Sequence, residues 1–565
     1  MRCLILDGHS RAALESAQAL GREHMEVFAA ATGPHCLLFH SRYLAHKFIL
    51  SDQSDQEFLN WLAEMDARHM FDLIIPSTEV SLRRLMALDE CDERRTKAVI
   101  SSNQSLEAAL SKDRTMRIAT EAGIAVPGFS LHTSTDDVLP TDQFPAVLKP
   151  VRSKVLVNGR TVALEVTIAK DKRTRDRRLR ELLAFGPVLE QRYIRGVGIG
   201  LEFLFERGQC KWYFAHERLH EFPLTGGASS YRKSIVAPPT ILNSSIRMLE
   251  RLSWHGVAMV EFKQAENGTF YLMEINPRLW GSLALSIDAG MNFPLGLLNM
   301  ATKKELAPQP PYRLGYCTRD LVNDVEWIKD NLRADHADPL LMTRPRFQSF
   351  AEYLRLFSGR ESWDHFDLHD LGITCASIAT IVRRYSKILA LKARSLIAKP
   401  KFSRHHSAVT RALKEGEVYP RNILFVCFGN ICRSPIAEAI ARQTITRCAV
   451  ASAGLHEKNG RPVAAPIRAA GAARGLDLSK CFSQQLTQAL VSESDLILPM
   501  DRKIFKIMSE RFPSAMSRST LLGCFAQRPI LDIEDPYLMQ PAQVEEVVGK
   551  IEEGVAGLRR FLSEL

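Results

Sequence analysis

Ten residues near the end of the chain, VCFGNICRSP, place a cysteine, turn-forming residues, an arginine and a serine directly after the apolar run NILFV. The apolar run predicts a buried strand, and SPIAEAIARQ predicts a helix with Ser434 at the cap position and Pro435 in its first turn. The loop between them can direct backbone N–H groups and a helix N-terminus at a phosphate dianion. Cys427, at the base of this loop, is therefore predicted to be a thiolate nucleophile.

The other groups that phosphate chemistry needs lie close by or near the end of the chain. Arg433 can hold two phosphoryl oxygens with its planar guanidinium, and Ser434 can donate its hydroxyl to the thiolate. Gly429 and Asn430 are predicted to supply the left-handed or otherwise cramped backbone of the loop. An acid must protonate the leaving oxygen, and Asp535 in LDIEDPYL, held on a turn by the next proline, is the candidate.

A second set of polar residues lies in MVEFKQAENGTFYLMEINPR. The turn sequence ENGT predicts two paired strands, which place Glu261 and Glu274 on facing positions with Asn276 on the same side. Two facing carboxylates repel each other, and two magnesium ions that bridge them to the phosphates of ATP would remove that repulsion. Arg278 follows and is predicted to hold a phosphoryl group.

ATP also needs cations and an adenine site upstream of this set. Lys112 in LSKD precedes a predicted helix, and Lys149 in AVLKP lies on a predicted strand. In LEQRYIRG, Gln191 is predicted to reach the adenine amino group, with backbone groups of Arg192 and Ile194 at the base edge. Neither GxxxxGK[ST] nor GxGxxG occurs in the sequence, which excludes a P-loop and a dinucleotide fingerprint.

These residues require several folded elements, and 565 residues are too many for one hydrophobic core. Residues 1–105 alternate strand and helix patterns, which predicts a small parallel α/β domain, and residues 106–305 show hairpin-rich α+β patterns. After a proline-rich break, residues 306–420 are predicted as a helical connector ending in a charged linker at 399–421. Residues 421–565 form the last domain, so the fold class is α/β and α+β multidomain.

The composition of the chain indicates in which compartment the protein works and which kinds of partner it binds. Eleven cysteines are scattered singly without a CxxC pair, the start of the chain has no secretory signal pattern, and no apolar window is long enough to span a membrane. We therefore expect a cytoplasmic protein. The net charge of +10 without an aromatic-basic pattern favours small anionic substrates such as nucleotides over nucleic acid. The basic amphipathic segment 377–399 is interpreted as a connector helix, with a membrane-surface or partner helix as the alternative.

The Cys427 stretch, together with ASAGL at 451–455, SDLILPMD at 494–501 and the late DPY, resembles the low-molecular-weight protein-tyrosine phosphatase family over about residues 422–565. The resemblance implies a four-stranded parallel α/β domain in which Cys427 attacks phosphorus to form a phosphocysteine. Arg433 then binds the phosphoryl oxygens, Ser434 assists the thiolate, and Asp535 acts as acid and later as base.

The resemblance also assigns the phosphate loop and the rim of its site. The loop residues between nucleophile and arginine are Phe428, Gly429, Asn430, Ile431 and Cys432. Tyr537 is expected to line the entrance, and His456 and Lys458 stand where the family often has an aromatic wall. Cys432 is either a partner for a reversible disulfide with Cys427 or a small buried residue. The expected substrate is a phosphotyrosyl protein or a small phosphoester.

The run from LSKDRT through AVLKP, LEQRYIRG and MVEFK to MEINPR resembles the ATP-grasp superfamily over about residues 1–300. The resemblance implies ATP and Mg²⁺ as cofactors. Lys112 and Lys149 then bind phosphates, with Arg278 at the transferred phosphoryl. Magnesium is assigned to Glu261, Glu274 and Asn276. The position where many members hold the ribose with a carboxylate is about Gly198 here, and Glu202 is the nearest acid.

ATP-grasp enzymes generally join a carboxylate to an amine through an acyl-phosphate. The sequence is therefore interpreted as a bifunctional bacterial enzyme, an amide-forming ligase fused to a cysteine-dependent phosphatase, with a small carboxylate and an amine as ligase substrates. The alternative is a tyrosine phosphatase regulated by an ATP-grasp module that only senses ATP or a metabolite. The complete set of predicted phosphate and magnesium ligands favours the ligase, since a sensor need not keep every one of them.

Overall fold

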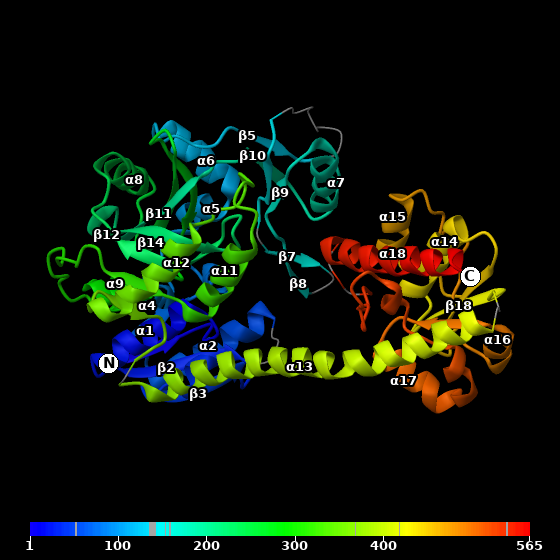
Figure 1. Ribbon diagram of the computed structural model, residues 1–565. Helices are drawn as coiled ribbons and strands as arrows, with labels where there is room; N and C mark the ends of the chain where they lie inside the picture. The colour runs from blue at the N-terminus through cyan, green and yellow to red at the C-terminus, as the bar shows by residue number, and fades with distance from the viewer. Residues whose placement is uncertain are drawn as a thin grey trace. The chain divides into compact units, whose positions relative to one another are not determined.

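The computed structural model of the protein describes residues 1–50, 54–134, 143–152, 154–157, 160–367, 369–416, 419–537, 539 and 541–565. The chain divides into two compact units, Met1–Val382 and Arg383–Leu565 (Figure 1). The units contain both parallel and antiparallel sheets, so the prediction of an α/β and α+β multidomain protein is confirmed. None of the helices in the described part of the chain combines the length and the apolar character that a membrane span requires.

The first unit begins with a parallel sheet of four strands in the order β3-β2-β1-β4, which agrees with the predicted small parallel α/β domain. Its strands and helices are β1 (Arg2–Ile5), α1 (Arg11–Arg22), β2 (Glu26–Thr32), β3 (Leu44–Leu50), α2 (Asp55–His69), β4 (Leu73–Ile75), α3 (Glu79–Met86) and α4 (Glu93–Ala98). Because strand side chains alternate, Ile5 joins the core cluster that includes Leu20 of α1, whereas Leu4 packs with Phe58 of α2. Helices therefore cover both faces of this sheet.

A seven-stranded sheet follows, in the order β15-β14-β11-β12-β13-β16-β17. Its strands are β11 (Gly196–Glu206), β12 (Gln209–Phe222), β13 (Ala228–Ser234), β14 (Gly256–Ala265), β15 (Phe270–Asn276), β16 (Cys317–Arg319) and β17 (Glu361–Trp363). The predicted hairpin turns are present: ERGQ joins β11 to β12, and ENGT joins β14 to β15. Arg207, Gly208 and Gly268 in these turns have positive φ, which tight hairpin turns require.

A smaller antiparallel sheet carries the upstream residues, in the order β5-β10-β6-β9. The elements of this region are α5 (Asn103–Leu110), α6 (Lys112–Glu121), β5 (Phe129–His132), β6 (Ala146–Pro150), β7 (Lys154–Val157), β8 (Arg160–Ala163), β9 (Thr167–Ala169), α7 (Lys172–Leu183) and β10 (Val188–Arg192). Arg175 of α7 lies 2.5 Å from the carboxylate of Glu190 on β10, and both side chains are buried. This ion pair fixes α7 on the sheet that holds Lys149 and Gln191.

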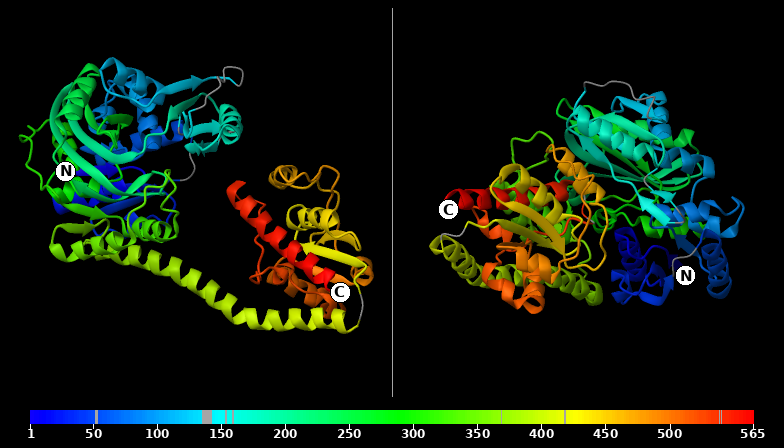
Figure 2. Two further views of the ribbon diagram at one scale, coloured as in Figure 1. Left: turned by 45° about the horizontal axis from the view of Figure 1, so that its top comes forward. Right: turned by 90° about the vertical axis from the view of Figure 1, so that its right-hand side faces the viewer.

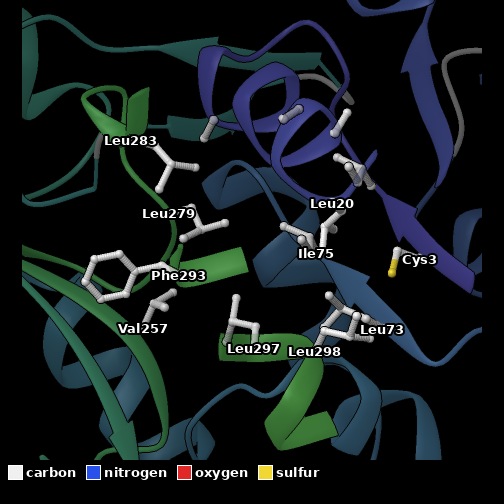
Figure 3. Packing of buried hydrophobic residues seen from close by; sticks show 14 of the residues in the cluster. Cys3, Leu20, Leu73, Ile75, Val257, Leu279, Leu283, Phe293, Leu297 and Leu298 are labelled. Atoms are coloured by element: carbon white, nitrogen blue, oxygen red, sulfur yellow. The ribbon is translucent and has the colours of Figure 1, made fainter. Parts of the chain in front are cut away.

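One hydrophobic core joins the N-terminal sheet to the seven-stranded sheet (Figure 3). Ile75 of β4, Val257 of β14 and Phe293 belong to this single cluster of buried side chains. The helices that border the larger sheet are α8 (Pro239–Arg251), α9 (Leu283–Ala289) and α10 (Phe293–Ala301). Residues 1–105 and 106–305, which the sequence analysis separated, thus share a core.

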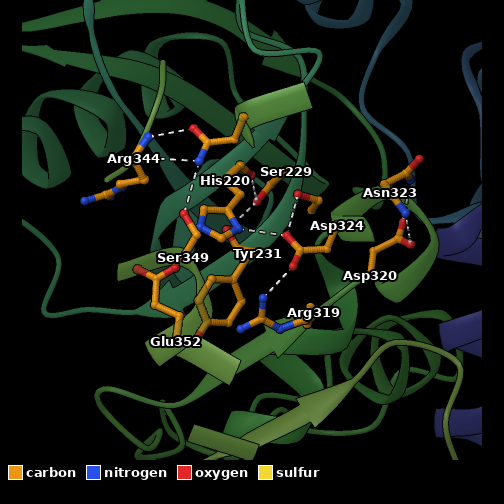
Figure 4. A network of polar contacts seen from close by, with 12 residues as sticks. His220, Ser229, Tyr231, Arg319, Asp320, Asn323, Asp324, Arg344, Ser349 and Glu352 are labelled. Carbon is orange, nitrogen blue, oxygen red and sulfur yellow. Dashed lines mark hydrogen bonds and ion pairs between the residues drawn. The ribbon is translucent and has the colours of Figure 1, made fainter. Parts of the chain in front are cut away.

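Residues 306–420 contain helices and also complete the large sheet through β16 and β17. The helices are α11 (Leu321–Arg333), α12 (Arg346–Ala351) and the 3-10 turn η2 (Glu352–Ser358). A buried polar network ties them to the sheet (Figure 4). His220 of β12 has Nδ1 2.8 Å from Asp324 Oδ1 and Nε2 2.9 Å from Glu352 Oε2, while Arg319 of β16 pairs with Asp324. The end of the first unit is therefore integral to its sheet.

A 45-residue helix, α13 (Leu371–Glu415), covers the predicted basic segment 377–399 and most of the predicted linker 399–421. The prediction of a linker was wrong for this stretch, since Val409 is buried in the core of the second unit. The linker was predicted partly from Pro400, because proline usually ends a helix. In the structure Pro400 lies inside a helix, where it removes one backbone hydrogen-bond donor.

The second unit has a three-layer arrangement around the parallel sheet β19-β18-β20 (Figure 2). Its elements are β18 (Asn422–Cys427), α14 (Arg433–Thr444), β19 (Ala449–Gly454), α15 (Ala465–Ala472), α16 (Gln488–Glu493), β20 (Leu496–Pro499), α17 (Arg502–Arg511) and α18 (Pro541–Ser563). Phe425 packs with side chains of α14, α15 and α18, and Val426 with those of α16 and α17. Where four strands were predicted, three are formed, and single parallel bridges at Gln485 and Ser519 extend the two edges.

Candidate active sites

The end of β18 positions Cys427, and α14 begins at Arg433, so residues 428–432 form the loop between them. The Cys427 Sγ atom accepts hydrogen bonds from the backbone N–H of Asn430 at 3.1 Å and from the Ser434 hydroxyl at 3.0 Å. The cysteine side chain is buried. Two donors directed at one sulfur are the surroundings that a charged sulfur nucleophile needs.

The start of α14 differs from the prediction that Ser434 caps it. Cys432 occupies the cap position, with no side-chain hydrogen bond, and Ser434 lies in the first helical turn. The physical reason is that the Ser434 hydroxyl is already directed at Cys427. An N-terminus without a side-chain cap keeps backbone N–H groups for an anion.

Asn430 shapes the loop. It has a φ of 51°, and its side-chain amide donates to the hydroxyls of Ser434 at 2.9 Å and Ser452 at 2.8 Å. The left-handed backbone predicted as one possibility for this loop is found at Asn430, whereas Gly429 has no positive φ. Gly454 at the end of β19 allows the close approach, because a Cβ there would lie 2.9 Å from the backbone nitrogen of Asn430.

Acidic and carbonyl groups hold the Arg433 guanidinium. Its Nη1 donates to Asp501 Oδ2 at 2.6 Å and to the Ile533 carbonyl at 2.8 Å, and its Nη2 to Asp535 Oδ2 at 2.9 Å. Burial opposes its charge, but Cys427, Asp535 and Asp501 together raise the pKa of Arg433. The structure therefore brings the four predicted catalytic residues together and adds Asp501, to which the sequence analysis gave no role.

The remaining loop and rim residues divide into buried and exposed groups. Burial raises the pKa of Cys432 to about 12, which keeps it a neutral thiol, and Ile431 packs against the core. Phe428 and Tyr537 are exposed, by 46% and 57%. The His456 ring meets the Phe428 ring edge-on, with 5.8 Å between the ring centroids. Exposed aromatic surface is thus present on the loop and next to the predicted acid.

The second site lies on the β14–β15 hairpin. Glu261 pairs directly with Glu274 across the strands, and Met259 with Asn276, so the predicted register is confirmed. The Asn276 amide nitrogen donates to an oxygen of Glu261 and to an oxygen of Glu274, each at 3.0 Å. The two carboxylates and the amide therefore converge on one point.

The predicted phosphate-binding cations lie around these carboxylates. Burial lowers the pKa of Lys149 to about 8, with Glu274 acting against the shift and Lys112 adding to it. Lys112, Glu274, Asn276 and Arg278 line one pocket. Lys149 of β6 and the hairpin residues come from different sheets, and the charges of Glu274 and Glu261 still act on the pKa of Lys149.

The predicted adenine residues are arranged differently. Gln191 is buried on β10, and its side-chain amide donates to the Met116 sulfur at 3.2 Å. The N–H of Arg192 donates to the Gly128 carbonyl at 2.9 Å, and Ile194 lies in the segment between β10 and β11. The Gln191 amide is therefore engaged inside the protein, and its predicted contact with adenine stays a prediction.

Arg218 of β12 belongs to the second site and was missed from the sequence. Its Nη2 lies 2.5 Å from Glu261 Oε2, and its Nη1 3.6 Å from Glu221 Oε1. Lys263 lies 4.0 Å from the second oxygen of Glu221. Two register shifts between Arg218 and Glu221 interrupt the period-two alternation of β12, so the sequence pattern could not place both side chains on this face. Only the register of three strands shows which carboxylate Arg218 reaches.

Comparison with known proteins separates the two halves. Residues 422–565 match the family model described as low molecular weight phosphotyrosine protein phosphatase. They are 40% identical over 135 residues to the probable low molecular weight protein-tyrosine-phosphatase EpsP of Ralstonia nicotianae, a match that covers 24% of this chain and 91% of that protein. The chain belongs to the low-molecular-weight protein-tyrosine phosphatase family.

The solved structure of Vibrio vulnificus Wzb in complex with benzylphosphonate is also similar to this phosphatase domain. The identity is 31%, the match covers 25% of this chain and 98% of that chain, and the TM-score is 0.24. The family model and the EpsP match confirm the phosphatase relationship inferred from the sequence.

The first unit matches a different family model. Residues 208–321 match the model described as ATP-grasp in the biosynthetic pathway with Ter operon. A solved L-amino acid ligase from Bacillus licheniformis has 15% identity, covers 54% of this chain and 77% of its own, and has a TM-score of 0.42. The family model confirms the ATP-grasp resemblance, and its range includes Arg218 and the β14–β15 hairpin.

Proposed function

We propose that the chain is a bifunctional enzyme, in which a phosphatase that depends on Cys427 is joined to an ATP-dependent carboxylate–amine ligase. The observation that carries the phosphatase half is the pair of hydrogen bonds to the Cys427 sulfur beside the buried guanidinium of Arg433. The ligase half is supported by the convergence of Glu261, Glu274 and Asn276 on the ATP-grasp hairpin.

In the phosphatase reaction the Cys427 sulfur attacks phosphorus, and the bond from phosphorus to the substrate oxygen breaks. Asp535 gives its proton to that oxygen, which leaves a phosphocysteine. Water then attacks the phosphocysteine, Asp535 accepts a proton, and phosphate departs. Arg433 binds the phosphoryl oxygens, which compete with Asp535 for its guanidinium and so release the acid.

In the ligase reaction the terminal phosphoryl of ATP moves to a carboxylate, giving ADP and an acyl-phosphate. The amine nitrogen attacks the acyl carbon, an amide bond forms, and phosphate leaves. Lys112, Lys149 and Arg278 bind phosphoryl oxygens and offset the charge that develops on them. Water must be kept from the acyl-phosphate for the amide to form.

The donor groups on the hairpin fit magnesium. Glu261 and Glu274 offer carboxylate oxygens, which this ion prefers together with substrate phosphates. The Asn276 amide nitrogen donates to both carboxylates here, so its side chain would turn its amide oxygen to the ion on binding. When bound there, magnesium would neutralise charge on the transferred phosphoryl. Among the described residues there is no group of three or more His, Cys, Asp or Glu side chains that could hold a metal ion.

The phosphatase substrate is proposed to be a phosphotyrosyl protein or a small aromatic phosphoester. The exposed rings of Phe428 and Tyr537 support an aromatic leaving group. A Cys427→Ser protein should retain phosphotyrosyl peptide, measured by fluorescence anisotropy, more tightly than the corresponding phosphoserine peptide. Equal retention of the two peptides would contradict the aromatic preference.

The ligase is tested with the Cys427→Ser protein, Mg-ATP and a bacterial metabolite extract. Chromatography follows ADP, and mass spectrometry detects any product equal to an acid plus an amine minus water. ADP together with such a product supports the ligase and names its substrates. ATP binding without ADP or product across varied extracts contradicts it and favours the alternative, in which the ATP-grasp part is a nucleotide sensor.

A further inference from the structure

Arg218 lies on β12, but its guanidinium ends at a carboxylate of β14. The Arg218 Nη2 atom is 2.5 Å from Glu261 Oε2. The other Glu261 oxygen, Oε1, accepts a hydrogen bond from the Asn276 amide at 3.0 Å. Protein donors thus engage both oxygens of a proposed magnesium ligand, and one of these donors carries a full positive charge.

Gly198 makes this long reach possible. β11 lies between β12 and β14, so the Arg218 side chain must cross it. A Cβ on Gly198 would lie 2.7 Å from Arg218 Cδ and 2.5 Å from Glu221 Oε1, closer than real Cβ atoms approach other atoms. Gly198 does not have a positive φ, so its backbone conformation does not require glycine. The missing side chain is needed because Arg218 passes over this position.

Arg218 keeps unused capacity for hydrogen bonding. Its Nε atom is buried and has no hydrogen-bond partner, and its Nη1 atom lies 3.4 Å from the Gly227 carbonyl and 3.6 Å from Glu221. A guanidinium binds phosphate oxygens with several parallel N–H groups, and magnesium prefers carboxylate oxygens shared with phosphates. Triphosphate oxygens would therefore offer Arg218 contacts that the Glu261 carboxylate alone does not supply.

We propose that Arg218 is the resident counter-cation of Glu261 and that it moves from Glu261 to nucleotide phosphates, so that this carboxylate takes up magnesium only together with nucleotide. The proposal rests on the nucleotide site of the proposed ligase. It assigns Arg218 as a positioning residue, and it explains why position 198 needs a residue without a side chain.

The test uses Mn²⁺ as the probe, titrated into the full-length protein and followed by the electron paramagnetic resonance signal of free Mn²⁺. Without nucleotide, the Arg218→Gln protein should bind Mn²⁺ with an affinity at least about tenfold higher than that of the unaltered protein, because a competing cation has been removed. Gly198→Ala should shift Mn²⁺ affinity in the same direction by displacing the arginine without removing it. Adding Glu261→Gln to Arg218→Gln should abolish the gain.

The role of nucleotide is tested by repeating the titrations with saturating ADP. ADP should raise the Mn²⁺ affinity of the unaltered protein by a larger factor than that of Arg218→Gln. The proposal would be overturned if ADP raised the Mn²⁺ affinity of both proteins by the same factor. It would also be overturned if, without nucleotide, Arg218→Gln and Gly198→Ala bound Mn²⁺ no more tightly than the unaltered protein. Calorimetry of Mg²⁺ and ADP with the unaltered protein tests the proposed ATP site separately. If no ADP binding is measured, the ligase proposal is wrong. The comparison of Mn²⁺ affinities without nucleotide still tests the role of Arg218 in that case.

Discussion

Asn430 illustrates how much a single side chain contributes to the Cys427 loop. Its amide donates to Ser434 and Ser452 and accepts from the backbone N–H of Gln484, at distances of 2.8–2.9 Å. It also adopts a left-handed backbone, which asparagine tolerates better than most residues with a Cβ. One residue therefore fixes both the curvature of the loop and the orientation of the Ser434 hydroxyl.

We expect Asn430→Ala to lower the free energy of unfolding of the phosphatase domain by about 3 kcal/mol, because three buried hydrogen bonds are lost. Asn430→Gly should lose about 1 kcal/mol less, since glycine adopts a positive φ without strain. The measurement is the urea concentration that halves phosphatase activity. Identical midpoints for the two variants would show that the left-handed conformation costs alanine nothing.

Lys149 predicts a pH dependence of nucleotide binding. Its pKa, lowered to about 8 by burial, lies below the unfolded value of 10.5. Between these two pH values Lys149 binds more protons in the unfolded chain than in the folded protein. The free energy of unfolding therefore rises as pH increases from about 8 to 10.5, because the charged lysine no longer has to be buried. Phosphates favour the charged lysine, so nucleotide affinity should be flat below pH 8 and should fall above it.

Calorimetry at pH 7 and 9 can measure this change, with Lys149→Arg as the matched control. Arginine stays charged across the range, so we expect its affinity for ADP to change much less than the roughly tenfold fall per pH unit that a single lost proton allows. A parallel fall in both proteins would place the titrating group elsewhere.

Most residues that could be predicted from the sequence have local partners, and Asp535, which pairs with the distant Arg433, is an exception. Cys427, Arg433 and Ser434 lie within one loop and helix turn, and the ENGT turn fixes Glu261 opposite Glu274. Arg218 and Asp501 could not be assigned in this way, because their partners lie on other strands or distant segments. The contacts of such residues depend on the strand order, which local patterns do not contain.

At the scale of elements, the end of β19 controls the shape of the neighbouring loop. A Cβ on Gly454 would lie 2.9 Å from both the Asn430 nitrogen and the Phe428 carbonyl oxygen. Both are backbone atoms, which cannot move aside as easily as the end of a flexible side chain. Gly454→Ala should therefore displace the loop and lower the turnover of p-nitrophenyl phosphate by about a hundredfold, in line with the cost of misplacing catalytic groups by about 1 Å.

Gly549 is the matched control, because it lies in α18 and a Cβ there meets nothing within 4 Å. Gly549→Ala should keep full turnover and raise stability by about 0.5 kcal/mol, as expected for alanine in place of glycine within a helix. Full activity of Gly454→Ala would show that the strand end does not constrain the loop.

The helix α13 shows how tertiary packing can outweigh the local sequence signals for a linker. Pro400 and a high density of charge at 399–421 resemble a linker, yet α13 continues through Pro400 to Glu415. Tertiary contacts decide the outcome, because Val409 is buried and the ring of Phe402 packs against that of Phe505 at 5.2 Å between centroids. Long-range packing of this kind overrides local propensity and cannot be read from the segment alone.

At the scale of the molecule, each compact unit has hydrophobic clusters of its own and one of the two candidate sites. Glu274→Gln should therefore abolish ATP-dependent product formation and leave hydrolysis of p-nitrophenyl phosphate unchanged. Cys427→Ser should do the reverse. Steady-state kinetics of the two variants measures both activities, and a loss of phosphatase turnover in Glu274→Gln would show that the sites are coupled.

The buried network of His220, Asp324, Glu352 and Arg319 has a consequence for exchange of gene segments. The ATP-grasp match ends at residue 321, but the sheet continues to Trp363. A cut at the end of the match would leave His220 without the acids on both of its ring nitrogens. A chimera with its junction at residue 321 should therefore unfold more readily than one that exchanges residues 1–382 as a whole.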